Sequence, residues 1–174
     1  GRLAPVRSVL MFIRYFADTP DGAHGQFARS YIRTLIKIAP TRIVTTTPGV
    51  FPPKWFPWSP LFNSPAAPDD AFINVVCCHP TRWAWNQNIG TQFRDGKPLE
   101  TVTARTELYT ANVRNVLIHC AGPRDQDQTA TAGRYEAMVV HDDACAMLWE
   151  MAGVRRPHVI GPDGLEAMRG VLFP

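Results

Sequence analysis

The segment from Tyr135 to Pro162, with the sequence YEAMVVHDDACAMLWEMAGVRRPHVIGP, decides the fold of this chain. It begins with a short apolar run at 136–140, which favours a β-strand. A polar break at 141–143 follows, and its aspartates can cap the N–H groups of a helix that starts near Ala144. The apolar pattern of a strand returns at 158–160. Strand, helix and strand in one short segment predict the βαβ unit of a parallel sheet.

The helix within this segment has an apolar face and a termination signal. Four residues recur with the spacing i, i+3, i+4 and i+7, which places them on one side of a helix with 3.6 residues per turn. They are Cys145, Leu148, Trp149 and Ala152. Gly153 follows where helices commonly end in a left-handed residue, so we expect the helix to stop there.

The rest of the chain repeats this alternation of strands and helices. A near-continuous apolar run from Val6 to Phe16 fits a strand that is buried on both faces, as in the centre of a parallel sheet. A helix at 26–39 and a strand at 41–47 follow, and the three elements predict a second βαβ unit with a right-handed crossover. Strands are expected near 6–14, 42–47, 72–77, 115–120, 136–140 and 158–160, and a short helix at 101–112.

These elements predict a single domain over residues 1–174. The chain length suits one domain with a sizeable core. Apolar strands separated by helices and loops indicate an α/β fold, namely a three-layer Rossmann-like domain with a mostly parallel sheet of about six strands. No run approaches the roughly 18 apolar residues of a membrane span, so we expect a cytoplasmic protein without one. The net charge is only +3 and the basic residues are scattered, which makes nucleic-acid binding unlikely.

The end of the segment quoted above carries a family resemblance. The matching residues are Ala152, Gly153, Val154, Arg156, Pro157, Val159, Ile160, Pro162 and Gly164. This pattern resembles the end of the N-terminal domain of GT-B glycosyltransferases of the family-4 type. A second stretch around Asn88, Ile89, Gly90 and Phe93 is similar to a sequence in some of these enzymes. It departs from them at Arg94, where they have an acidic residue, so no catalytic role is carried over.

The resemblance implies a glycosyltransferase-like domain that binds the acceptor side of a sugar-transfer reaction. In GT-B enzymes a C-terminal domain binds most of the nucleotide-sugar donor, whereas this chain stops where the linker to that domain begins. Activity would therefore need a second, donor-binding domain or chain. No cofactor is expected, since a nucleotide sugar would be a substrate.

The loop before the first expected helix is the best candidate for a ligand contact. Gly22 and Gly25 permit a tight turn, and the N–H groups of the helix start near Gln26 favour an anion or a sugar hydroxyl. His24 lies between the two glycines. The G-x-x-G spacing departs from the dinucleotide fingerprint, which argues against NAD. A glycine turn without a ligand remains the alternative.

Polar residues at the ends of other strands are further candidates. His79 follows the strand at 72–77, and His141 and Asp142 follow the strand at 136–140. Because ligands bind beyond the carboxyl ends of strands in open α/β sheets, we expect these residues to bind substrate together with the Gly22–Gln26 loop. His119 would join this cluster if the sheet order allows. Helix capping is the alternative role for Asp142. No catalytic motif is present, so the catalytic residues stay unknown.

The four cysteines predict reduced, mostly buried thiols rather than a metal site. Their positions are 77, 78, 120 and 145. A zinc site that draws on Cys77, Cys78, His79, His119, Cys120 and His141 is the alternative, because all of these residues fall near strand ends. The chain has no C-x-x-C spacing, and neighbouring residues 77 and 78 point to opposite faces of a strand, so we expect no metal.

A segment rich in proline and aromatic residues interrupts the pattern at 48–68. Its prolines exclude a regular helix and favour an extended path. The aromatic residues of its 51–62 part would be costly to expose, so this arm is expected to pack on the domain, on a protein partner or on a second copy in a homo-oligomer. Sugar stacking on Trp55 or Trp58 is a further reading.

Two other functions remain open at this stage. The chain could be a noncatalytic interaction or structural component, including a viral one, that kept the glycosyltransferase fold and docks through the arm. It could also be a nucleotide-binding enzyme of another Rossmann-like family. The fold does not decide between them.

Overall fold

The computed structural model describes the chain except residues 1–9, 16–22, 46–57, 61–71, 78–82 and 95–96, and describes only the backbone of 10, 23–24, 44–45, 58–60, 72, 83–94 and 97–107. Its main sheet has seven strands in the order β3-β2-β1-β4-β7-β8-β9, and every neighbouring pair is parallel. The strands are β1 (Leu10–Tyr15), β2 (Thr41–Thr45), β3 (Trp58–Pro60), β4 (Phe72–Cys77), β7 (Arg114–Ile118), β8 (Ala137–Val140) and β9 (His158–Val159).

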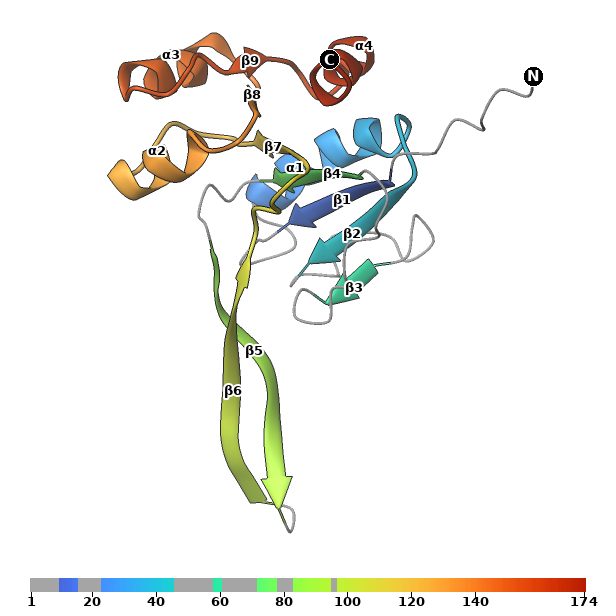
Figure 1. Ribbon diagram of the computed structural model, residues 1–174, viewed down its shortest axis with the longest axis vertical. Helices are drawn as coiled ribbons and strands as arrows, with labels where there is room; N and C mark the ends of the chain where they lie inside the picture. The colour runs from blue at the N-terminus through green and yellow to red at the C-terminus, as the bar shows by residue number, and fades with distance from the viewer. Residues whose placement is uncertain (1–9, 16–22, 46–57, 61–71, 78–82, 95–96) are drawn as a thin grey trace, which may run out of the picture.

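In the part of the chain that the structure describes, four helices cover this sheet as two outer layers (Figure 1). The helices are α1 (Ala23–Leu35), α2 (Gln126–Ala132), α3 (Asp143–Met151) and α4 (Leu165–Leu172). One buried cluster joins α1 and α4 to one face of the sheet, and a second cluster joins α2 and α3 to the other face. The expected three-layer Rossmann-like α/β fold is therefore confirmed.

The central strand β1 shows why the apolar run near the start of the chain has no alternation. Met11, Ile13 and Tyr15 belong to the cluster beneath α1 and α4, whereas Phe12 belongs to the cluster beneath α2 and α3. Successive side chains of a strand point to opposite faces, so a strand between two helical layers must be apolar on both.

The order of the strands places a reversal of chain direction between β1 and β4. From β1 the sheet grows through β2 to β3 on one side, and from β4 through β7 and β8 to β9 on the other. In doubly wound α/β sheets, the crevice at such a reversal, beyond the carboxyl ends of the strands, is where ligands bind. Residues 16–22 and 78–82, which follow β1 and β4 in the chain, lie outside the described residues.

A long hairpin connects β4 to β7. Its antiparallel strands β5 (Trp83–Arg94) and β6 (Lys97–Glu107) form a ribbon that projects away from the main sheet (Figure 1). The short helix expected at 101–112 is wrong, because residues up to Glu107 belong to β6. The β-branched residues Thr101, Val102, Thr103 and Thr106 favour a strand there.

Two buried asparagines fix the point where this hairpin rejoins the sheet. The Asn74 amide on β4 donates to the Asn115 side-chain oxygen on β7 (2.8 Å) and to the Leu108 carbonyl (2.7 Å). Asn115 in turn accepts from the Thr110 backbone N–H (2.9 Å) and donates to the Thr110 carbonyl (2.8 Å). Buried amides are stable only when they are paired in this way.

The segment that predicted the fold forms β8, α3 and β9. The Asp142 carboxylate accepts a hydrogen bond from the Cys145 backbone N–H (2.8 Å), so the expected N-cap is confirmed. Gly153 has a φ of +98°, as expected of a left-handed residue after a helix. The expected inner face is partly wrong: Trp149 is fully buried, but Leu148 is 51 % exposed and Ala146 is buried in its place.

Helix α4 was not expected from the sequence. It follows β9 and packs beside α1, and the Arg114 guanidinium donates to the Val171 carbonyl (2.9 Å). The turn before α4 is tied to α1, because the Tyr31 hydroxyl donates to the Ile160 carbonyl (2.5 Å) and the Thr34 hydroxyl to the Pro162 carbonyl. These bonds fix α1 against the last strand of the sheet.

The proline- and aromatic-rich segment contributes β3, an edge strand that pairs with β2. The remainder of 48–68 lies outside the described residues, and so does most of the 51–62 arm expected to contact a partner. Among the helices that the structure describes, none has the length and apolar character needed to cross a membrane.

Candidate functional site

The candidate site lies at the edge of the sheet where the parallel strands end. His141 directly follows β8, and His119 directly follows β7, which is the neighbour of β4 on the side away from β1. Helix α1 begins at the same edge, since it follows β1 and returns the chain toward the start of β2. Because the strands are parallel, the residues that follow β7 and β8 and the start of α1 lie at the same edge of the sheet, as expected.

Helix α1 begins at Ala23, three residues earlier than the sequence predicted. His24, Gly25 and Gln26 therefore lie in its first turn and not in a loop, and Gly22 lies outside the described residues. Gly25 is buried whereas Gln26 is exposed. The first-turn N–H groups of a helix have no partner within the helix, so the ligand-binding argument applies to residues 23–26.

Aromatic packing joins the start of α1 to the end of β8. The His141 ring lies edge-on to the Phe27 ring, with centroids 5.7 Å apart and an interplanar angle of 73°. Phe27 also contacts Tyr31 one turn later, at 4.8 Å between centroids. Two of the predicted groups of site residues, 24–26 and 141–142, are thus on neighbouring elements.

His141, Asp142 and Cys145 form a tight polar cluster at the start of α3. The Nε2 atom of His141 is 3.0 Å from one carboxylate oxygen of Asp142, and the other oxygen accepts the Cys145 N–H. The Cys145 thiol points to the Cys120 carbonyl, at 3.9 Å. Among the described residues, these three side chains are a set whose donor atoms, all within 4.8 Å of one another, can hold a metal ion.

The surroundings at the start of α3 shift the pKa values of Asp142 and Cys145 in opposite directions. The hydrogen bond from the Cys145 backbone N–H is the main cause that lowers the pKa of Asp142, and a hydrogen bond from the Cys145 side chain adds to it. Both bonds stabilise the carboxylate. Burial, with the nearby Asp142 and Cys120, raises the pKa of the Cys145 thiol to about 11. At neutral pH the site therefore presents a carboxylate beside a protonated thiol.

The other histidines expected at this edge differ in their surroundings. His119 is only 6 % exposed, and its ring lies edge-on to the buried Trp149 at 5.7 Å. This places it under α3, in the packed layer. His79 lies outside the described residues, so the expected three-histidine cluster stays a prediction.

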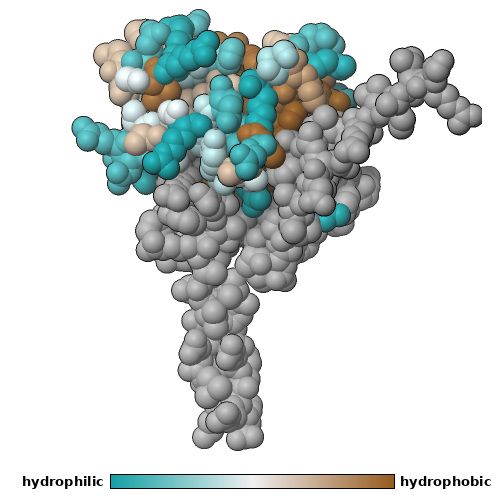
Figure 2. All heavy atoms as spheres, in the orientation of Figure 1, coloured by the Kyte–Doolittle hydropathy of each residue, from teal (hydrophilic) through white to brown (hydrophobic). Residues whose placement is uncertain are grey.

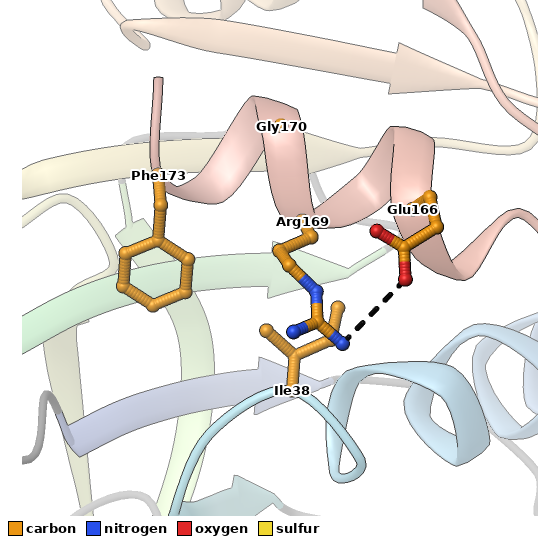
Figure 3. A pocket seen from close by; sticks show the side chains of 5 residues that line it. All are labelled: Ile38, Glu166, Arg169, Gly170 and Phe173. Carbon is orange, nitrogen blue, oxygen red and sulfur yellow. Dashed lines mark ion pairs between the residues drawn. The ribbon is translucent and has the colours of Figure 1, made fainter.

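A shallow groove of about 410 Å³ lies away from this edge, between α4 and the turn after α1 (Figure 3). Its lining residues are Ile38, Glu166, Arg169, Gly170 and Phe173. Arg169 and Glu166 are 3.8 Å apart, so the one cation in the lining is already paired with a carboxylate. Ile38 lies in the turn that leads from α1 to the start of β2, which puts the groove near the beginnings of the strands.

The outer side of α3 exposes large apolar side chains. Met147, Leu148 and Met151 are 51 %, 51 % and 76 % exposed, and Val159 on the edge strand β9 is 41 % exposed. Figure 2 shows a mainly hydrophilic surface over α2, with hydrophobic patches between the hydrophilic side chains of the upper helices. This side of the domain has the chemistry of a protein contact.

Comparison with known proteins gives no support for a family assignment: no family model matches the chain, and neither does any curated protein or solved structure at a significant level. The resemblance to GT-B glycosyltransferases stays a prediction that is compatible with the fold.

Two members of the site were not singled out from the sequence, namely Phe27 and Cys145. The position of Cys145 could have been found, because the side chain of an N-cap residue reaches the backbone of the residue three positions later. The contact between Phe27 and His141 depends on the order of strands, which no local pattern reveals.

Proposed function

We propose that this domain binds a sugar acceptor at the carboxyl edge of its sheet and forms the acceptor half of a glycosyltransferase. The observation that supports this most is the ring contact between Phe27 in α1 and His141 after β8, at the edge of a sheet whose strand order reverses between β1 and β4. A reversal of this kind is the common ligand position of the fold. The resemblance of residues 152–164 to the family supplies the substrate class.

Each described site residue has a chemical use toward a sugar. The N–H groups at 23–26 donate to hydroxyl or anionic oxygens, and the exposed Gln26 side chain can donate and accept. The Asp142 carboxylate accepts hydroxyl protons through the oxygen that faces His141, since its second oxygen caps α3. His141 fixes this carboxylate and presents an exposed ring edge to the ligand.

The transfer reaction needs a donor that this domain does not bind alone. In the proposal, a second Rossmann-like domain or a separate chain supplies the nucleotide sugar across the same edge. The residue that accepts the acceptor proton is not assigned, because both exposed candidates, His141 and Asp142, also have structural partners.

A ligand screen with matched carboxylate variants tests this proposal. We would measure the melting temperature of the chain with monosaccharides, disaccharides, nucleotides and nucleotide sugars. A ligand that binds only the folded state raises the melting temperature by an amount that grows with the logarithm of its excess over Kd. We expect a sugar-dependent rise that Asp142→Asn reduces and Asp143→Asn retains, because asparagine keeps the helix cap but loses the charge.

A screen without any sugar-dependent rise would contradict the proposal. A rise that is equal in wild type and Asp142→Asn would place the ligand elsewhere. The control residue Asp143 is one position further along, is 84 % exposed and pairs with Arg156 at 3.3 Å, so its substitution tests a general charge effect at the same helix start.

The exposed apolar side of α3 favours a second function, that of an assembly component. A continuous Met147, Leu148 and Met151 surface is suited to packing against another protein, and methionine is common on such surfaces. Light scattering over a range of concentrations tests it. Concentration-dependent association that Met151→Lys removes, together with a negative ligand screen, would favour this function over sugar binding.

A further inference from the structure

The cluster of His141, Asp142 and Cys145 has features that helix capping alone does not require. Capping uses one oxygen of Asp142 and the backbone N–H of Cys145. It does not require the His141 Nε2 atom to lie 3.0 Å from the second oxygen of Asp142, or the Cys145 thiol to lie close to both of these groups. All three donor atoms lie within 4.8 Å of one another.

The donor set matches the ligand preferences of one metal in particular. Zinc binds thiolate, imidazole and carboxylate together, with bond lengths of about 2.0–2.3 Å. Tetrahedral bonds of that length separate ligand atoms by roughly 3.3–3.8 Å. The present spacing needs only small side-chain rotations to reach this geometry. Magnesium and calcium prefer all-oxygen sites, so the thiol disfavours them.

The fold holds these ligands in place before any metal binds. The N–H of Cys145 orients the Asp142 carboxylate, and the Phe27 ring packs against the His141 ring at 5.7 Å. Cys145 is in the first turn of α3, so its backbone is fixed by the helix. Contacts of this kind behind the ligands commonly raise metal affinity.

We propose that His141, Asp142 and Cys145 bind a Zn²⁺ ion, with a fourth position open at the carboxyl edge of the sheet. Binding displaces the proton of the Cys145 thiol to solvent, and the thiolate and the carboxylate together balance the charge of the ion. That balance offsets the positive end of the α3 dipole, which by itself disfavours a cation. The open position makes the site resemble zinc sites that bind water or substrate more than closed structural ones.

Zinc titration of the whole chain tests the site directly. Metal-free protein would be titrated with ZnCl₂ in a calorimeter under reducing conditions. We expect one equivalent to bind, and Cys145→Ser and His141→Gln each to weaken binding by at least about tenfold, since losing even a supporting contact commonly costs 10–100-fold. Asp142→Asn should also weaken binding while it keeps the helix cap.

Matched controls separate ligand loss from unfolding. His158→Gln removes an exposed histidine on β9, and Asp143→Asn removes the neighbouring carboxylate; both should bind zinc as wild type does. Circular dichroism confirms that each variant is folded. The proposal is wrong if wild type binds no zinc, or if Cys145→Ser and His141→Gln bind it as tightly as the controls do.

Cobalt provides a spectroscopic test that does not depend on affinity. Co²⁺ bound to a thiolate shows a sulfur-to-metal charge-transfer absorption, which water and nitrogen ligands do not produce. We expect this absorption in wild type and in His158→Gln and its loss in Cys145→Ser. If Cys145→Ser retains the absorption, another cysteine binds the ion and this assignment is overturned.

Discussion

The His141 ring lies edge-on against the Phe27 ring, with 5.7 Å between their centroids. Residue 27 belongs to α1, which follows the first strand, and residue 141 directly follows β8, on the far side of β4 and β7. One contact thus links the first and last thirds of the chain at the edge where a ligand is expected. Three of the predicted site residues, His24, Gly25 and Gln26, lie just before Phe27.

Replacing Phe27 with alanine should loosen this edge without unfolding the domain. Replacing a fully buried phenylalanine with alanine lowers the free energy of unfolding by about 3–5 kcal/mol. Phe27 is only partly buried, so its replacement should lower it by about 1–2 kcal/mol. Urea denaturation measures the free energy of unfolding, and NMR should show the His141 ring signals moving. Phe173→Ala, at a 41 % exposed position, should cost less. Unchanged His141 signals would mean that the two rings are not in contact in solution.

The effects of substituting Asn74 and Asn115 on the free energy of unfolding should be coupled. Each alanine substitution leaves a buried partner without its hydrogen bond, which costs about 1–3 kcal/mol. The double variant should cost less than the sum of the two single variants, with a coupling of about 0.5–3 kcal/mol, because the second change removes the group that the first one leaves unpaired. Urea denaturation of all four proteins gives this value. Strictly additive costs would show that the 2.8 Å bond between the two amides contributes nothing.

Gly153→Ala should destabilise the protein through backbone strain alone. A Cβ atom at this position meets nothing within 4 Å, but φ is +98°, where other residues are strained. We expect a loss of about 1 kcal/mol in thermal or urea unfolding. Gly170→Ala is the matched control, since it also has free space around its Cβ but lies inside α4. That change should stabilise by up to about 1 kcal/mol. Equal effects of the two substitutions would contradict the left-handed conformation at 153.

Cys77 should resist alkylation in the folded protein across the ordinary pH range. Burial raises the pKa of its thiol to about 12, and only the thiolate reacts. From pH 7 to 9 the folded state therefore keeps the thiol protonated and enclosed, whereas the unfolded chain titrates near its ordinary value. Labelling by iodoacetamide, followed by mass spectrometry, should track urea unfolding at a fixed pH, and without urea it should stay negligible from pH 7 to 9. Rapid labelling of Cys77 at pH 8 without urea would show that the end of β4 is open.

The segment at 135–162 was sufficient to predict the fold, because its signals are local. The capping Asp142, the left-handed Gly153 and the strands on either side of α3 all depend on near neighbours in the chain. Burial on α3 was harder to predict. Leu148 is apolar but faces outward, since the sheet under this short helix covers only the side that carries Ala146 and Trp149.

Two elements were missed although the sequence contains their signals. The Asp95-Gly96 pair between β-forming runs is typical of a hairpin turn, and it was overlooked in favour of a helix at 101–112. Leu165, Met168 and Leu172 have helical spacing after Gly164, but no element was predicted after the last strand.

The sequence was enough to predict at which edge of the sheet the candidate site lies, but not which residues contact one another there. Parallel strands place His141, Asp142 and the start of α1 on one rim whatever their order, so this part needed only the strand assignment. The contact of His141 with Phe27 needs the actual strand order. The approach of the Cys145 thiol to Asp142 needs the cap to form. Capping uses one oxygen of Asp142, and the other oxygen lies 3.0 Å from His141, so the cap leaves that oxygen available for a second contact.

The most direct test of the ligand-binding edge is a backbone NMR titration with the sugars from the melting-temperature screen. The account predicts that amide signals of residues 23–27 and 141–145 move together and saturate at one ligand affinity, whereas those of α4 and the groove at Ile38 and Phe173 stay fixed. Movement confined to α4, or no movement at any sugar concentration, would contradict it.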